Sequence, residues 1–189
     1  DVTDFSEAVD DRVATVIQDA GGIRVSYNDA GNAVTLNTAF ATQLFHVADH
    51  KAQNTAGGTF TAGAWRTRDL NTTLTNEITS ASLAANQISL PAGTYYCEWA
   101  APAQDNGNNP HQTRLQDITN TATLLTGESA TTGSSMNSFS RGGGRFTLAG
   151  TTTIELQHQN TSNQVTDGFG SPCNFTTEVY SSIKIWKVG

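Results

Sequence analysis

From about Ala39 to the end of the chain, apolar residues recur at every second position in short segments. A period of two is the spacing of side chains on one face of a β-strand. Polar or glycine-rich clusters such as Asn54–Gly58, Gly142–Gly144 and Asn160–Gly170 separate the segments and are expected to form turns. Roughly eight to ten short strands joined in this way are typical of a β-sandwich or barrel.

The composition supports a folded chain that carries few charges. Charged residues make up 14% of the 189 residues and aromatic residues 8%, whereas a disordered chain has more charge and fewer aromatic groups. The net charge is −7, and no stripe of Lys or Arg occurs, so nucleic acid is not expected as a partner. No apolar run approaches the ~20 residues of a membrane span, so membrane insertion is not expected either.

The N-terminal part has a helical period instead. Phe5, Val9 and Val13 recur at a spacing of four, which places them on one side of a helix. Two glycines, Gly21-Gly22, would end it. We therefore predict a short helix over residues 4–20.

A β-hairpin is predicted after this helix. Apolar and polar residues alternate over Ile23–Tyr27 and again over Val34–Leu36, with a polar turn between them. Residues 1–40 are thus expected to form a helix-and-hairpin module, and residues 41–189 a β-sandwich head. A module this small buries too little surface to be stable alone, so its apolar stripe needs a partner, either the head or further copies of itself.

The last strand is apolar on both faces. Ile183 and Ile185 lie on one face, and Trp186 and Val188 lie on the other. A sandwich strand with a solvated back would alternate apolar with polar residues, so both faces are expected to be covered. We predict a homotrimer formed through this sheet, and the alternative is coverage by the N-terminal segment of the same chain. The same alternation predicts the core residues Leu90, Tyr95, Cys97, Trp99, Phe146, Leu148 and Leu156.

The two cysteines, Cys97 and Cys173, match no zinc or redox motif. Two interpretations stay open. They are either two small buried thiols or one disulfide between distant strands, because a bridge depends on the distance between the two Cα atoms.

Five segments, in this order and spacing, resemble phage tail-fibre and tail-tip proteins. They are Gly57–Thr72, Ile88–Tyr96, His111–Leu115, Gly144–Gly150 and Ile183–Val188. The resemblance implies a trimeric jelly roll similar to tumour-necrosis-factor and complement globular heads, and the N-terminal module resembles a spacer unit of fibre shafts. It further implies the receptor-binding tip of a tail fibre, at the distal end of the fibre in the virion. Its partners would be the rest of the fibre and a bacterial surface glycan or outer-surface protein.

Histidines are the first candidates for a site. The spacing of His46, His50, His111 and His158 matches no zinc motif. In a trimer, however, one axial histidine becomes three, and His111 or His158 could then form a metal or anion site. The alternative is an ordinary hydrogen-bonded histidine on a strand, and we expect no metal and no cofactor.

No motif for catalysis stands out. The stretch Asp105–Asn109 is rich in side-chain oxygens, but it has one carboxylate and lacks the spacing of a calcium loop, so a polar turn is expected. No Gly-x-Ser-x-Gly nucleophile elbow and no phosphate-binding glycine loop occurs. We therefore predict a binding module and not an enzyme.

Receptor contacts are expected from the long polar loops, because a rigid sandwich presents its connections to partners. The strand aromatics, Trp65 among them, are expected in the core or at a subunit interface. The loops are rich in amide and carboxylate groups that suit a hydroxyl-rich target. The residues favoured for receptor contact are Asp105, Asn106, Asn108, Asn109, His111, Asn160, Asn163, Gln164 and Asp167.

Two other functions stay open. One is a structural trimerisation or decoration knob without a ligand, which a folded trimer that binds no cells would favour. The other is a glycan-cleaving fibre domain, which a carboxylate pair about 5–9 Å apart in a groove would favour.

Overall fold

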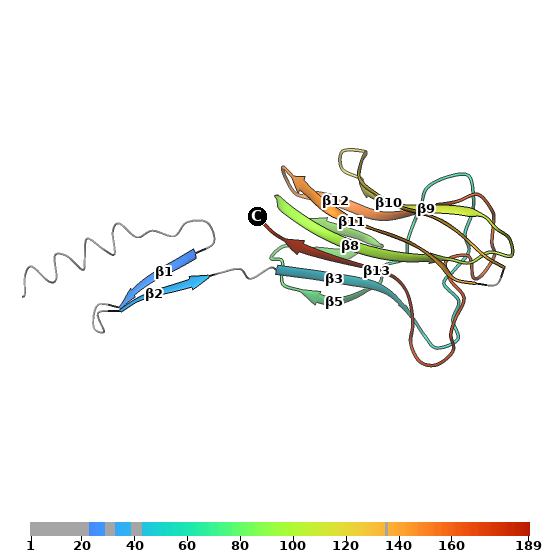
Figure 1. The fold of residues 1–189 in the computed structure, drawn as a ribbon, viewed down its shortest axis with the longest axis horizontal. Coiled ribbons are helices and arrows are strands. Elements are labelled where there is room, and N and C mark those ends of the chain that lie inside the picture. Colours follow the sequence, from blue (N-terminus) through green and yellow to red (C-terminus); the bar gives the residue numbers. More distant parts are fainter. Residues whose placement is uncertain (1–22, 29–32, 39–42, 135) are drawn as a thin grey trace, which may run out of the picture. The chain divides into compact units, whose positions relative to one another are not determined.

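The computed structural model describes residues 23–28, 33–38, 43–134 and 136–189. The chain divides into two compact units, Asp1–Thr42 and Gln43–Gly189. In the first unit, β1 (Ile23–Asn28) and β2 (Ala33–Thr38) pair antiparallel as a hairpin (Figure 1). The helix predicted over residues 4–20 lies outside the described residues. Within the described residues, no helix is long and apolar enough to cross a membrane.

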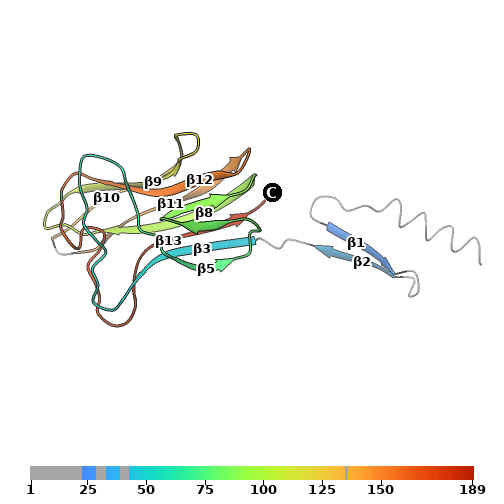
Figure 2. The same ribbon diagram turned by 180° about the vertical axis from the view of Figure 1, so that it is seen from behind.

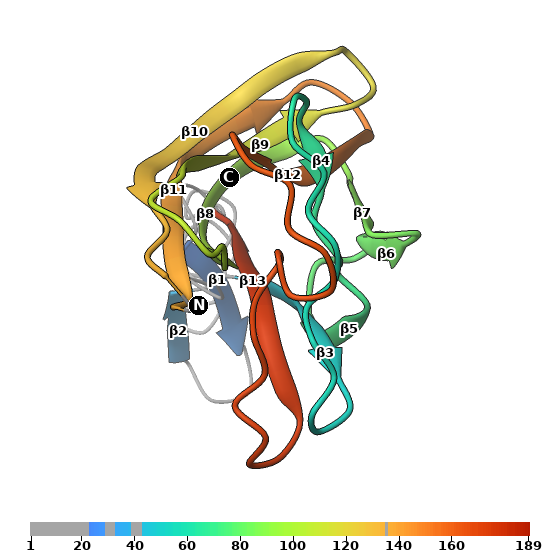
Figure 3. The same ribbon diagram turned by 90° about the vertical axis from the view of Figure 1, so that its right-hand side faces the viewer.

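The second unit is a sandwich of two antiparallel sheets (Figures 1 and 2). In Figure 3 the layers are seen along the strands, with β9, β10 and β12 in one and β3 and β13 in the other. The five-stranded sheet has the order β11-β8-β13-β3-β5 and consists of β3 (Gln43–Lys51), β5 (Thr72–Asn76), β8 (Gly93–Ala103), β11 (Ser138–Leu148) and β13 (Glu178–Lys187).

The six-stranded sheet has the order β10-β9-β12-β7-β6, and β4 pairs with β12 beside this path. No helix occurs among the described residues of the sandwich, so the predicted all-β fold is confirmed. The strands of this sheet are β4 (Arg66–Thr67), β6 (Ser82–Ala84), β7 (Gln87–Leu90), β9 (Pro110–Asp117), β10 (Ala122–Thr131) and β12 (Thr152–Asn160).

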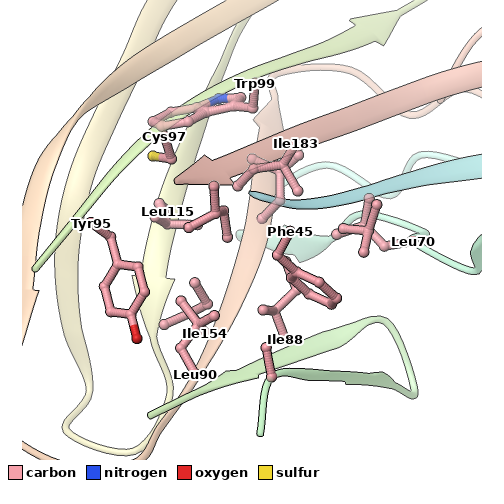
Figure 4. Close-up of a cluster of buried hydrophobic side chains, with 14 of the residues drawn as sticks. Phe45, Leu70, Ile88, Leu90, Tyr95, Cys97, Trp99, Leu115, Ile154 and Ile183 are labelled. Atoms are coloured by element: carbon pink, nitrogen blue, oxygen red, sulfur yellow. The ribbon is translucent and has the colours of Figure 1, made fainter. Parts of the chain in front are cut away.

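The core lies between the two sheets, and the seven residues predicted for it are all buried there. Tyr95, Cys97 and Trp99 project from one face of β8 into the core (Figure 4). Ile183 and Ile185 of β13 are also fully buried, which confirms one side of the two-sided pattern. On the other side of β13, Trp186 is half-buried and Val188 is 44% exposed.

A polar contact joins the two sheets inside this core. The indole Nε1 of Trp99, on β8, donates a hydrogen bond of 2.8 Å to Thr113 Oγ1, on β9 of the other sheet. Ser140 of β11 lies 2.8 Å from the same Thr113 oxygen. Because a buried indole N–H without an acceptor is costly, this contact sets where the Trp99 ring lies.

The turn expected at Gly142–Gly144 is wrong, because these glycines lie in the middle of β11. Gly142 is paired with Trp99, and Gly144 with Cys97. A Cβ on Gly142 would overlap the Trp99 ring, and a Cβ on Gly144 would come within 2.9 Å of Leu125. The glycines are therefore needed for the close approach of neighbouring side chains and not for a change of chain direction.

The two cysteines are not bonded to each other. Cys97 is a free thiol in the core, as the first interpretation expected, and its burial raises its pKa to about 12. Cys173 is a free thiol on the surface, so the prediction of a second buried thiol is wrong. It lies in the long β12–β13 connection, where no alternation of apolar residues directs a side chain inward.

We expect Gly142→Ala to destabilise the sandwich by about 2 kcal/mol or more, because the added methyl group displaces the buried Trp99 ring. Gly150→Ala is the matched control, since nothing lies within 4 Å of a Cβ at that position. It should change the free energy of unfolding by less than about 0.5 kcal/mol. Urea unfolding followed by tryptophan fluorescence measures both, and equal stabilities of the two variants would contradict this role of Gly142.

Candidate functional site

The long connections of the sandwich gather at one end. The loops β3–β4, β8–β9, β10–β11 and β12–β13 lie there, and Gln43 and the C-terminal residue lie at the other end (Figures 1 and 2). Backbone hydrogen bonds join the loops in pairs. Phe60 and Gln164 exchange two of them, and Thr132 N donates to Asn109 O at 3.0 Å. We call this surface the loop end.

The nine residues predicted for receptor contact all come from the β8–β9 and β12–β13 connections and the strand ends beside them. Their side chains differ in exposure. Three are exposed: Asn106, Asn108 and Asn163. Three are half-buried: Asn109, Gln164 and Asp167. Three are buried: Asp105, His111 and Asn160.

Several of these side chains hold the loops in place. Asn163 Oδ1 accepts a hydrogen bond of 2.7 Å from Ala62 N of the β3–β4 loop. Gln164 Nε2 donates to Asp167 Oδ1 at 2.7 Å within the β12–β13 connection. The loop end is thus fixed by side-chain contacts as well as by backbone pairing, although it contains few regular elements.

Beneath the loops lies the buried guanidinium of Arg68. Its Nη1 donates to Pro102 O at 3.0 Å and its Nη2 to Phe169 O at 2.9 Å, and its Cζ lies 4.1 Å from the centre of the Phe169 ring. Burial lowers the pKa of Arg68 to about 10, so the group remains cationic at neutral pH. The nearby carboxylates of Asp49 and Asp69 oppose this shift.

Two histidines form a buried pair close to Arg68. His111 Nδ1 and His158 Nε2 are 2.9 Å apart, and the Phe60 ring packs edge-on against His158. Burial and the positive charge of Arg68 lower the pKa of both rings, for His111 to about 4. Both rings are buried within the subunit and are directed to each other, which favours the interpretation of ordinary hydrogen-bonded histidines on strands. The described residues contain no group of three or more His, Cys, Asp or Glu that could hold a metal ion.

Some buried polar atoms near the loop end lack a partner among the described residues. They include His111 Nε2, His158 Nδ1, Arg68 Nε, Gln104 Oε1 and Asn160 Nδ2. Buried polar groups are normally hydrogen-bonded, and those without a protein partner are usually bound to water or to a ligand.

A shallow hollow of about 220 Å³ opens beside the loop end, on the six-stranded sheet. We call it the lateral hollow. The first residues of β9, Ser129 of β10 and the end of β12 contribute to it. It is lined by Trp65, Pro110, His111, Gln112, Ser129, Gln159, Asn160 and Thr161.

Trp65 was expected in the core or at an interface, but it is half-buried at this hollow. The guanidinium of Arg114 stacks on its ring, with the Arg114 Cζ 4.3 Å from the ring centre. Arg114 in turn donates from Nε and Nη2 to Gln157 Oε1, at 2.9 and 2.8 Å. These contacts hold the indole in one orientation. Sequence reasoning missed Trp65, Gln112, Ser129 and Gln159, because only the pairing of β9, β10 and β12 brings them together.

Sequence comparison finds no matching family model and no matching curated protein. Among solved structures, murine APRIL is 8% identical, with a TM-score of 0.52 over 78% of this chain and 99% of that one. The globular domain of a zebrafish complement 1qA protein is 13% identical, with a TM-score of 0.46 over 78% and 98%. At these identities the likeness bears on the fold alone, and the APRIL match confirms the predicted jelly roll of the tumour-necrosis-factor type.

We expect the protein to lose stability in acid because of the buried histidine pair. The unfolded chain takes up protons below its histidine pKa of 6.5, whereas the folded protein does not protonate His111 until about pH 4. Stability is therefore complete above the unfolded pKa and falls as the pH drops between these values, by about 3 kcal/mol for His111.

Urea unfolding between about pH 4 and pH 8 measures this loss. His111→Gln should flatten the profile relative to the parent protein. Carboxyl groups also contribute to the pH profile, and burial raises the pKa of one of them, Asp49. Subtracting the profile of the variant from that of the parent protein removes these contributions. A parent profile that does not fall with acidification would contradict the account.

Proposed function

We propose that this chain is a trimeric receptor-binding head, the attachment tip of a phage tail fibre that recognises a bacterial surface. The observation that carries the proposal is that the two ends of the sandwich differ: the chain enters at one end, and the polar loops lie at the other. The sandwich begins at Gln43 at one end, whereas the loops with exposed amides gather at the opposite end (Figure 1). A head held at one end and presenting polar loops at the other is suited to attachment.

The outer face of the five-stranded sheet supports the trimer. Leu44, Trp186 and Tyr96 are directly paired across β3, β13 and β8 and form one apolar row. Tyr96 is 41% exposed, and its ring centre lies 6.1 Å from that of Trp186. An aromatic row on an open sheet face is more typical of a surface covered by another subunit than of a solvated one.

The rest of this face is suited to close packing. Glu98, Lys184 and His46 form the next row, and Ala100, Ser182 and Ala48 the one after it. The last row consists of small side chains, which allow another subunit to approach the sheet closely. In a closed assembly the same patch is used by every subunit, so one apolar row is buried three times.

We expect the parent protein to be a trimer by multi-angle light scattering and Trp186→Glu to be a monomer. The added charge would be buried without a partner at the interface, whereas Trp186 is only half-buried within its own subunit. Phe175→Glu is the control, because Phe175 is 87% exposed in the β12–β13 connection. Circular dichroism checks that both variants fold. A monomeric parent protein at micromolar concentration would overturn the trimer.

We expect the purified, labelled protein to bind a susceptible bacterial strain and to lose binding when Asn106–Asn108 and Asn163 are replaced together by Gly and Ala. These residues include the exposed members of the predicted contact set. The control replaces Asn120 and Thr121, which lie in a turn at the other end of the sandwich. Stripping the cells of surface glycan separates a glycan receptor from a protein one. A folded trimer that binds no strain of a broad panel would favour a structural knob instead.

A further inference from the structure

We infer that the lateral hollow is a binding site for one neutral sugar ring, formed by Trp65 and the polar row Ser129, Gln112 and Gln159. The inference rests on the proposed function in that it assigns a receptor chemistry to this head. It adds to the loop contacts a sugar site on the outer face of the six-stranded sheet, beside the loop end.

The polar row is a product of strand register. Gln112 of β9 is directly paired with Ser129 of β10 on one side and with Gln159 of β12 on the other. Arg66, the residue after Trp65, is paired with His158, so the indole lies at the Gln159 end of the row. Two planar amides, one hydroxyl and one aromatic ring thus share a single hollow. Amides and hydroxyls both donate and accept hydrogen bonds, and an indole face packs on the C–H groups of a sugar.

The hollow is polar but carries no formal charge at neutral pH. None of its lining residues is Asp, Glu, Lys or Arg. Two cations lie near the Trp65 side of the hollow: Arg66 donates to Thr61 O and Ala62 O, and Arg114 donates to Gln157 and to Thr123 Oγ1 and stacks on Trp65. The charge of Arg114 is therefore occupied in positioning the indole. A phosphate, sulfate or carboxylate would find no cation among the lining residues to pair with, so a neutral ligand fits this surface better than an anionic one.

The polar groups differ in how far they are already engaged. Gln112 Nε2 donates to Gly127 O at 3.0 Å and to Ser129 Oγ at 3.2 Å, which fixes its amide in place. The Gln159 amide makes no side-chain hydrogen bond within the described part of the chain, so it remains available to a ligand. Two buried lining residues, His111 and Asn160, also have a polar atom without a partner in that part of the chain.

The size of the hollow limits what it takes. At about 220 Å³ it is smaller than the ~300–1,000 Å³ pockets that hold drug-sized ligands. It therefore holds a single ring, while neighbouring rings of a glycan chain remain in solvent. Affinity for one ring is expected to be weak, and a trimer displays three such hollows, which raises the avidity for a repetitive surface.

The test measures binding of the methyl glycosides of neutral hexoses to the full-length protein by saturation-transfer NMR. Gln159→Ala removes the free amide, and Gln159→Trp fills the hollow. Gln43→Ala is the matched control, a half-buried glutamine at the opposite end of the sandwich. We expect a neutral glycoside to bind, both Gln159 variants to weaken binding at least tenfold, and the control to bind as the parent does. A hexose phosphate should bind at least tenfold more weakly than the neutral glycoside.

Unchanged binding in both Gln159 variants, or a preference for the hexose phosphate, would overturn the inference. Labelled protein is tested on bacterial cells in parallel, because this separates the inference from the proposed function. Binding of cells without binding of any neutral glycoside means that the hollow is not the site, while the attachment function stands. Binding of glycosides that is lost in the Gln159 variants, without binding of any cells, supports the hollow and overturns the attachment function.

Discussion

The loop end depends on one buried cation. Arg68 follows β4 and donates to backbone carbonyls of two other segments, Pro102 at the end of β8 and Phe169 in the β12–β13 connection. An isolated charge in a protein interior is costly, so the two carbonyls, the Phe169 ring and the field of Asp49 and Asp69 must offset its desolvation. Few other side chains could bridge both segments at once, because the guanidinium has five N–H groups in one plane.

The positive charge of Arg68 also acts on its neighbours. Burial, and after it the charge of Arg68, lowers the pKa of His111 and His158 and keeps both rings neutral, and a neutral pair can share one hydrogen bond between Nδ1 and Nε2. His111 is at the same time a lining residue of the lateral hollow. The hollow therefore stays neutral because His111 is buried and lies near a buried cation, and protonation of His111 in acid would destabilise the fold and place a charge in the hollow.

Strand-level features could be predicted from the sequence, because alternation reports directly on which side chains face a core. Tyr95, Cys97 and Trp99 were placed correctly by this argument. The alternation failed at Gly142–Gly144, since glycine marks both turns and close packing, and the partner ring of Trp99 lies more than forty residues away in sequence. Neither Cys173 nor Trp65 lies in a strand, so no period could indicate their exposure.

The candidate site could be predicted in part only. Loop composition identified residues that gather at the loop end, but it could not distinguish exposed Asn106 from buried Asp105. The polar row at the lateral hollow could not be predicted from the sequence, because Ser129, Gln112 and Gln159 become neighbours only through the register of three strands.

The register of β9, β10 and β12 allows the residues that line the lateral hollow to change without a change in the core. Side chains on the outer face of the six-stranded sheet do not contribute to the core, so Gln112, Ser129 and Gln159 can be replaced without loss of the residues that bury apolar surface. Trp65 and Arg114 are held by each other and by Gln157, which keeps the aromatic wall in place while the row beside it varies. The loops are held by backbone pairing and by Arg68, so their sequence and length can vary less. A change in the length of one loop would disturb several segments at once. A strand face of this kind therefore combines a rigid frame with replaceable contacts, which is consistent with the sugar site that we propose there.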